Sequence, residues 1–266
     1  MTFSPNATLY VSLALYATGT LLALGSLYWR EKRLQTVALW VMIVGFVSHT
    51  AWIGTICVRT GHPPITNLPE ASSFVAWTVF AVELGLFFRY RVQAAAFFVY
   101  PLVLLLLTLT AVVHEPFAKM DPVLRSRVFM THLLFSTVGV AALMIGIAFN
   151  ALAFVQDRAL KQKRPGRMWE WIPSLEICKR VSYRALAAGF PIYTIGLIAG
   201  VLWSYRTTAG LMDLRVKQVG AVIAWVLFAV LLQSYITGMF RARRTLLVSA
   251  AAFIAVIVAI LGISHV

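Results

Sequence analysis

Eight long apolar runs dominate the sequence, and no other feature limits its fold as strongly. The runs cover approximately residues 7–28, 34–58, 71–88, 94–113, 128–155, 185–204, 217–239 and 245–264. A helix needs about 20 mostly apolar residues to cross a bilayer, and continuous rather than alternating runs favour helices over a barrel. The chain is 61% hydrophobic and only 12% charged, unlike soluble domains. We therefore predict an all-α, polytopic membrane protein with about eight transmembrane helices.

Lysine and arginine are divided unequally between the alternate loops of this arrangement. Sixteen fall in the loops that follow the first, third, fifth and seventh helices, and seven fall in the other set. Cytoplasmic loops carry the excess of these residues, so the first set is predicted to be cytoplasmic and both termini outside. This topology explains the net charge of +14, and no nucleic-acid partner is inferred.

The longest cytoplasmic stretch, about 156–184, combines the basic run 161–167 with an aromatic, partly amphipathic continuation. We predict an interfacial segment that lies on anionic lipid, with docking of a cytoplasmic enzyme as the alternative. The sequence has no internal repeat and no room for a separate soluble domain. Residues 1–266 are therefore interpreted as a single transmembrane domain.

All five histidines are predicted to lie in the outer half of the membrane or beyond it. His62 and His114 are in outer loops, where a histidine is usually solvated. His132 and His265 are at the outer ends of the fifth and eighth helices, where they are either functional or polar caps at the interface. His49 is inside the second helix, where an ionisable group is costly and indicates either a functional site or a hydrogen bond in the bundle interior.

Histidines on the outer side suggest a metal site. Neutral imidazole is a common metal ligand, and two imidazoles from different helices can bind haem iron axially. Haem also needs an apolar wall and cations for its propionates, and suitable residues lie toward outer helix ends: Trp77, Trp203, Arg125 and Arg127. Tryptophans at such depths are more often anchors of the aromatic belt. Glu83, in the inner half of the third helix, is interpreted as a buried structural residue.

Residues 49–72, HTAWIGTICVRTGHPPITNLPEAS, resemble the early region of the CcsA/HemX-like cytochrome c assembly membrane proteins. The family pattern there is an intramembrane histidine, an arginine, Gly-His-x-Pro and Asn-x-Tyr-Glu-Ser, with Pro69 and Ala71 as departures. The stretch from His132 is similar to the family's outward histidine that opens a long helix. The last helix ends in His265, where the family carries its second outward histidine.

Departures between these two histidines point to one branch of the family. Haem-delivering members carry a tryptophan-rich outer segment there, whereas residues 203–225 keep Trp203, Lys217 and Trp225 in register but lack the tryptophan cluster and Asp-Pro. Gln233 stands where many synthetase relatives carry an intramembrane histidine. The chain therefore looks most similar to the HemX branch, which is associated with haem biosynthesis and its regulation.

The resemblance implies a haem-binding protein of the HemX type in a bacterial cytoplasmic membrane, acting in haem handling or in regulating haem biosynthesis or cytochrome c maturation. It implies non-covalent haem b, with His132 and His265 as axial ligands and His49 as a second ligand or relay position. Arg125 or Arg127 would meet the propionates.

Two alternatives stay open. One is a CcsA-like haem lyase component that delivers haem to apocytochrome c, and the other is a scaffold for a haem-biosynthetic enzyme. The implied partners are haem, the bilayer, and either a haem-biosynthetic enzyme or a cytochrome c maturation component. Catalysis is not the expectation, because nothing resembles a nucleophile activated by a neighbouring base.

Overall fold

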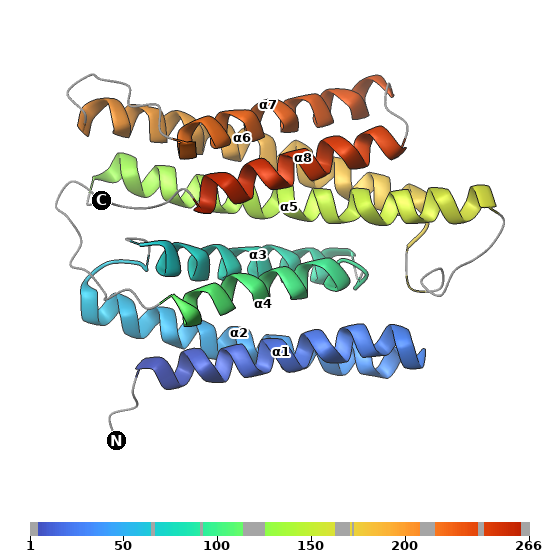
Figure 1. Ribbon diagram of the computed structural model, residues 1–266, viewed down its shortest axis with the longest axis horizontal. Helices are drawn as coiled ribbons and strands as arrows, with labels where there is room; N and C mark the ends of the chain where they lie inside the picture. The colour runs from blue at the N-terminus through green and yellow to red at the C-terminus, as the bar shows by residue number, and fades with distance from the viewer. Residues whose placement is uncertain are drawn as a thin grey trace. The chain divides into compact units, whose positions relative to one another are not determined.

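The eight apolar runs form eight helices. The structure, a computed structural model, describes residues 5–64, 67–90, 93–113, 126–162, 171, 173–207, 216–238 and 242–261. Within these ranges it contains no strand, and its helices (Figure 1) are α1 (Pro5–Trp29), α2 (Lys32–Thr60), α3 (Leu68–Tyr90), α4 (Ala96–Val112), α5 (Arg127–Gln162), α6 (Leu175–Thr207), α7 (Val216–Thr237) and α8 (Ala242–Leu261). The prediction of an all-α protein with about eight helices is confirmed.

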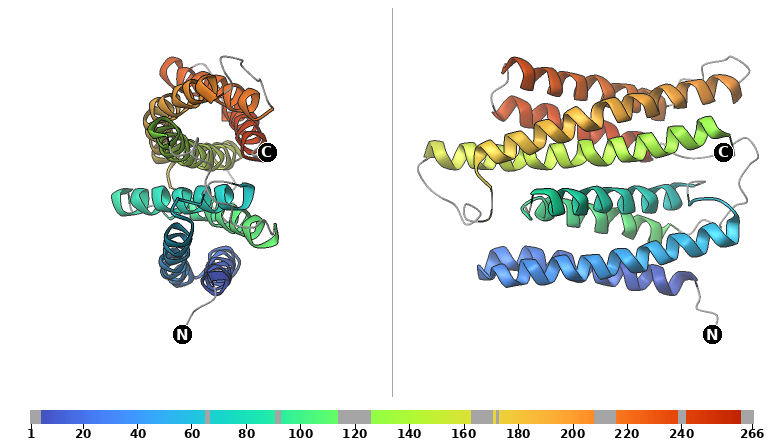
Figure 2. Two further views of the ribbon diagram at one scale, coloured as in Figure 1. Left: turned by 90° about the vertical axis from the view of Figure 1, so that its left-hand side faces the viewer. Right: turned by 180° about the vertical axis from the view of Figure 1, so that it is seen from behind.

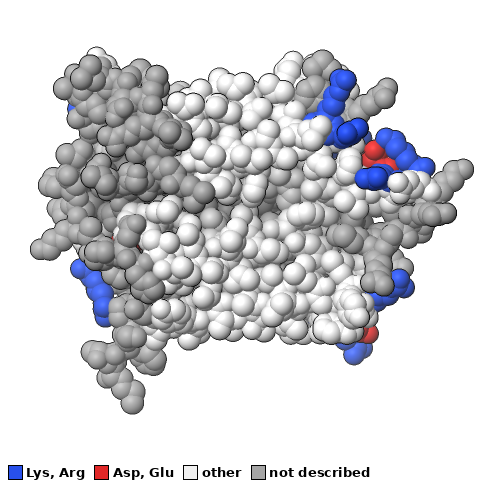
Figure 3. All heavy atoms as spheres, in the orientation of Figure 1, with Lys and Arg blue, Asp and Glu red and all other residues white. Residues whose placement is uncertain are grey.

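Seven of these helices are long and apolar enough to cross a membrane, and α4, with 17 residues, is the shorter one. A length of 17 residues is at the lower limit for a spanning helix. On the face drawn in Figure 3, the described lysine and arginine side chains lie at the ends of helices, and uncharged side chains cover the stretch between. The chain is a multi-pass membrane protein.

Short polar residues begin several helices by accepting hydrogen bonds from otherwise unpaired backbone N–H groups. Asn67 Oδ1 accepts from the N–H of Glu70 at 2.9 Å to open α3, and Ser126 Oγ accepts from the N–H of Phe129 at 3.1 Å to open α5. Gly61 ends α2 in the left-handed conformation with φ 74°, which a glycine adopts without strain.

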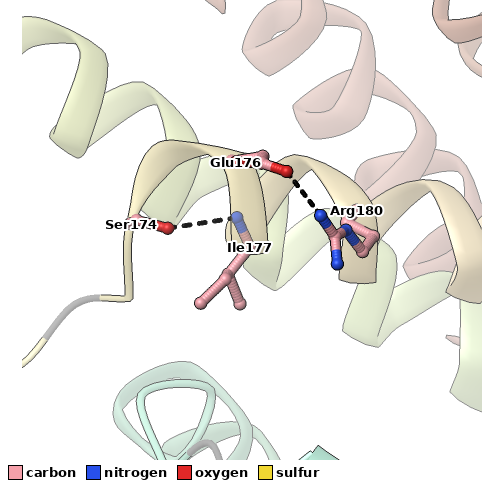
Figure 4. Close-up of polar contacts among 4 residues, drawn as sticks. All are labelled: Ser174, Glu176, Ile177 and Arg180. Atoms are coloured by element: carbon pink, nitrogen blue, oxygen red, sulfur yellow. Dashed lines mark hydrogen bonds and ion pairs between the residues drawn. The ribbon is translucent and has the colours of Figure 1, made fainter.

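Helices α5 and α6 extend beyond the apolar runs that predicted them. Helix α5 continues to Gln162 and α6 begins at Leu175, so the segment 156–184 contains the last turns of one and the first turns of the other. Figure 4 shows the start of α6, where Ser174 caps the helix through the N–H of Ile177. One turn on, Arg180 and Glu176 form an exposed ion pair of the i, i+4 type. The interfacial placement of this segment stays a prediction.

Helices α1 to α4 belong to one compact unit of the chain, and α5 to α8 belong to a second. In the first unit α1 packs on α2 and α4, and α3 packs on α4 and α2. Its core is aromatic, since the ring centroid of Phe80 lies 5.9 Å from those of both Tyr16 and Tyr100. All three side chains are buried, so the core joins α1, α3 and α4.

The second unit is a closed bundle in which α5 contacts α6 and α8, and α7 contacts α6 and α8 (Figure 2, left). One buried asparagine, Asn150 of α5, makes side-chain hydrogen bonds to each of the other three helices of this unit. Its Nδ2 donates to Ser249 Oγ of α8 at 2.9 Å, and its Oδ1 accepts from Ser182 Oγ of α6 at 2.9 Å and from the hydroxyl of Tyr235 of α7. A buried polar group in lipid needs such partners, and here they fix the relative register of four helices.

Candidate functional site

His132 lies five residues after the start of α5 and is half-buried against α6. Its Nδ1 is 2.8 Å from the carbonyl oxygen of Gly196, and Ser136 Oγ is 3.2 Å from the same nitrogen. Because a carbonyl oxygen only accepts, Nδ1 carries the proton and the lone pair of the neutral ring is on Nε2. A backbone carbonyl behind the second ring nitrogen is the usual support of a metal-ligating histidine. This geometry differs from that of a cap directed at lipid headgroups.

Aromatic side chains extend this site along α5 and α6. The buried ring of Phe129 lies with its centroid 6.2 Å from that of His132 and 4.9 Å from that of Trp203 on α6. The helix pair therefore brings His132 and Trp203 to the same aromatic cluster. Arg127, the first residue of α5, is exposed at the same helix end.

Two of the predicted site residues, His265 and Arg125, lie outside the described residues, and so does His114. The convergence of His132 and His265 on one iron therefore stays a prediction.

His49 is fully buried in the first unit and has a hydroxyl partner on each ring nitrogen. Its Nε2 is 2.7 Å from Ser73 Oγ of α3, and its Nδ1 is 3.3 Å from the hydroxyl of Tyr16 of α1. Each hydroxyl both donates and accepts, so either tautomer of the ring is satisfied. The side chain thus joins three helices by hydrogen bonds, which was one of the two interpretations of an intramembrane histidine.

Trp77 of α3 belongs to the same unit as His49, and not to the unit that contains His132. Its ring is stacked on Phe46 and Phe74, with centroids 5.4 Å and 6.0 Å away. Its Nε1 donates to Thr50 Oγ1 at 2.9 Å. These contacts make it part of an aromatic stack beside the helix that carries His49.

Sequence reasoning missed two features of these sites. His62, expected to be solvated in its loop, is only 4% exposed, and its Nδ1 donates to the carbonyl oxygen of Pro63 at 2.7 Å. The second feature is the α6 groove behind His132, formed by Gly196 and Gly200. Glycines spaced four residues apart lie on one helix face and permit close helix packing, which is the signal that could have indicated it.

Glu83 is buried, as expected, at 3% exposure. Its Oε2 has no hydrogen-bond partner among the described residues.

Comparison with known proteins decides the family. The family model for the cytochrome C assembly protein matches residues 65–266 of the chain, which is well over half of its length. The chain belongs to the cytochrome c assembly protein family. This match takes in α3 to α8 and includes three of the five histidines, His114, His132 and His265.

Individual members of the cytochrome c assembly family resemble the chain over most of its length. The Cytochrome c biogenesis protein CcsA of Guillardia theta is 25% identical and covers 98% of this chain and 92% of its own. Protein HemX of Brevibacillus brevis is 21% identical, with 73% of this chain and 71% of its own covered. Protein HemX of Bacillus subtilis is 22% identical, with 82% and 80% covered. The predicted resemblance to the CcsA/HemX-like cytochrome c assembly family is confirmed.

Proposed function

We propose that this chain is a haem-binding membrane protein of the HemX type, which handles haem b non-covalently at the outer surface of a bacterial cytoplasmic membrane. The observation that carries the proposal is the hydrogen bond of 2.8 Å between His132 Nδ1 and the carbonyl oxygen of Gly196. It presets the ring for ligation through Nε2 before any ligand arrives.

The residues around His132 fit a flat apolar ligand with acidic groups. His132 and His265 would be the axial ligands, Phe129 and Trp203 would line one side of the ligand, and Arg127 would meet a propionate. Arg127 is exposed and lies five residues before His132 on α5, so a bound anion would stay at the water boundary. When bound, haem would supply an iron that the imidazole nitrogens of these histidines can ligate.

For His49 we propose the relay position rather than an axial ligand. Both ring nitrogens already have hydroxyl partners, and ligation would break one of these bonds in a buried site where a lost partner is costly. A histidine hydrogen-bonded on both sides can accept a proton on one nitrogen and release one from the other.

A second candidate function is delivery of haem to apocytochrome c. In its favour, the relative named CcsA is matched over 98% of this chain, against 73% for the HemX protein of Brevibacillus brevis. Residues 203–225 argue against haem delivery, because they lack the tryptophan cluster expected of a haem-delivering member. The HemX-type role therefore remains the leading proposal, and the assay below separates the two.

The proposal is tested on the full chain purified in mild detergent from haem-replete bacteria. We expect a Soret band with low-spin character and haem b that acidified acetone extracts, which marks it as non-covalent. The holoprotein is then incubated with a reduced CxxCH peptide. Covalent attachment of haem to the peptide would replace the leading proposal by the second candidate. Absence of haem would overturn both and leave a scaffold for a haem-biosynthetic enzyme, docked through 156–184.

A further inference from the structure

Helix α6 has no side chain at the point where the His132 ring lies against it. A Cβ atom built on Gly200 would be 2.6 Å from Nδ1 of His132 and 2.7 Å from its Cε1. Real Cβ atoms do not approach other heavy atoms this closely, so the ring occupies space that any other residue at position 200 would fill.

The same groove presents the acceptor for the ring. In an α-helix the carbonyl of residue 196 accepts from the N–H of residue 200, and a carbonyl oxygen has a second lone pair for another donor. His132 Nδ1 uses it at 2.8 Å. Reaching it requires the bare backbone of Gly200, one turn further along the helix, because a side chain there would stand between the ring and the carbonyl.

The two helices are in backbone contact at this level. A Cβ on Gly196 would lie 2.5 Å from the backbone nitrogen of Ser136, and one on Gly139 would lie 2.7 Å from the Cα of Tyr193. The position of the carbonyl relative to His132 is therefore fixed by main chain rather than by mobile side chains. Such support is what a ligand site needs to keep its geometry.

We propose that Gly200 is a positioning residue of the haem site, whose missing side chain lets the Gly196 carbonyl fix the place and tautomer of His132. The inference rests on the proposed function and names the residue that prepares its ligand. Gly200 does not itself touch haem.

The first test needs no variant and no haem. Nitrogen NMR of the apoprotein labelled with ¹⁵N-histidine reports the tautomer of each ring, and the His132 signals are assigned by their loss in His132→Ala. We expect His132 to be protonated on Nδ1. Protonation on Nε2 would overturn the inference.

The second test compares Gly200→Ala with Gly146→Ala, a matched substitution in the same helix pair. The nearest atom to a Cβ on Gly146 would be in the Leu186 side chain, at 3.0 Å, and the Ser182 carbonyl oxygen would be at an ordinary contact distance of 3.5 Å. Gly146 is about four turns from His132. Alanine is a better helix former than glycine, so neither helix is itself weakened. Loss of such an outer hydrogen bond lowers metal affinity about 10–100-fold. For Gly200→Ala we expect a roughly 10–100-fold lower affinity for haem and conversion of low-spin to high-spin haem. For Gly146→Ala we expect a haem affinity within twofold of the wild type.

Equal losses in the two glycine variants would show a general effect of helix packing and overturn the inference. So would wild-type affinity in Gly200→Ala alongside lost affinity in His132→Ala, although the proposed function would then stand. Wild-type protein without haem would overturn the proposed function and this inference together.

Discussion

Replacing His49 by alanine should destabilise the first unit strongly and leave haem binding in place. The side chain is fully buried and makes hydrogen bonds of 2.7 Å and 3.3 Å to Ser73 and Tyr16. Hydrogen bonds between membrane helices contribute roughly 0.6 kcal/mol on average and up to about 1.7. Truncating a large buried side chain to alanine costs about 2–5 kcal/mol through lost contacts and the remaining cavity. We therefore expect His49→Ala to lower the free energy of unfolding by about 3–6 kcal/mol.

Smaller changes at the same contacts give the matched controls for His49→Ala. Ser73→Ala removes the shorter bond and should cost about 1–2 kcal/mol, and Tyr16→Phe removes the longer bond and should cost less than about 1 kcal/mol. Unfolding in mixed micelles, followed by circular dichroism, measures each value, and a double-mutant cycle gives the coupling of His49 with Ser73. A cost below about 1 kcal/mol for His49→Ala would refute the reasoning. Loss of low-spin haem from a variant as stable as the wild type would instead identify His49 as a ligand.

Three further predictions concern the second unit, the topology and the buried carboxyl group. Asn150→Ala should lower the free energy of unfolding by about 2 kcal/mol, because three interhelical hydrogen bonds are lost. A change below about 0.5 kcal/mol in the same micelle assay would contradict the conclusion that Asn150 connects the four helices. In a background without native cysteines, an impermeant maleimide added outside cells should label Arg206→Cys and spare Lys179→Cys, both of which are exposed positions; the reverse pattern would invert the topology. Glu83→Gln should keep the melting temperature and the haem spectrum, and loss of haem from the folded variant would show that Glu83 belongs to the site.

The helices could be predicted from hydropathy because the bilayer demands long apolar runs, and each of the eight runs became a helix. The ends of α5 and α6 were missed because helix formation there depends on caps and amphipathic packing rather than on hydropathy. Ser174 caps α6, which begins at Leu175, ten residues before the predicted span, and Cys178 and Ser182 in its first turns are fully buried. Hydropathy alone assigns such polar helical turns to a loop.

The candidate site, like the helices, could be predicted from the sequence only in part. His132 could be selected from its residue type and its place at a helix end, but its partner Gly196 is 64 residues away in sequence. Only the packing of α5 on α6 brings the two together. Because every residue has a backbone carbonyl group, the residue type at position 196 does not identify it as the acceptor. His62 was misjudged because burial of a loop depends on the contacts that the fold supplies, such as the hydrogen bond from Thr60 Oγ1 to the His62 carbonyl oxygen at 3.0 Å.

The central claim is that haem binds at the outer surface through His132 and His265. Electron paramagnetic resonance of the oxidised, detergent-purified protein tests it most directly, because two imidazole ligands give a low-spin signal. His132→Ala and His265→Ala should each abolish that signal while the protein stays folded, and His114→Ala should keep it. A low-spin signal that persists unchanged in His132→Ala would contradict the claim.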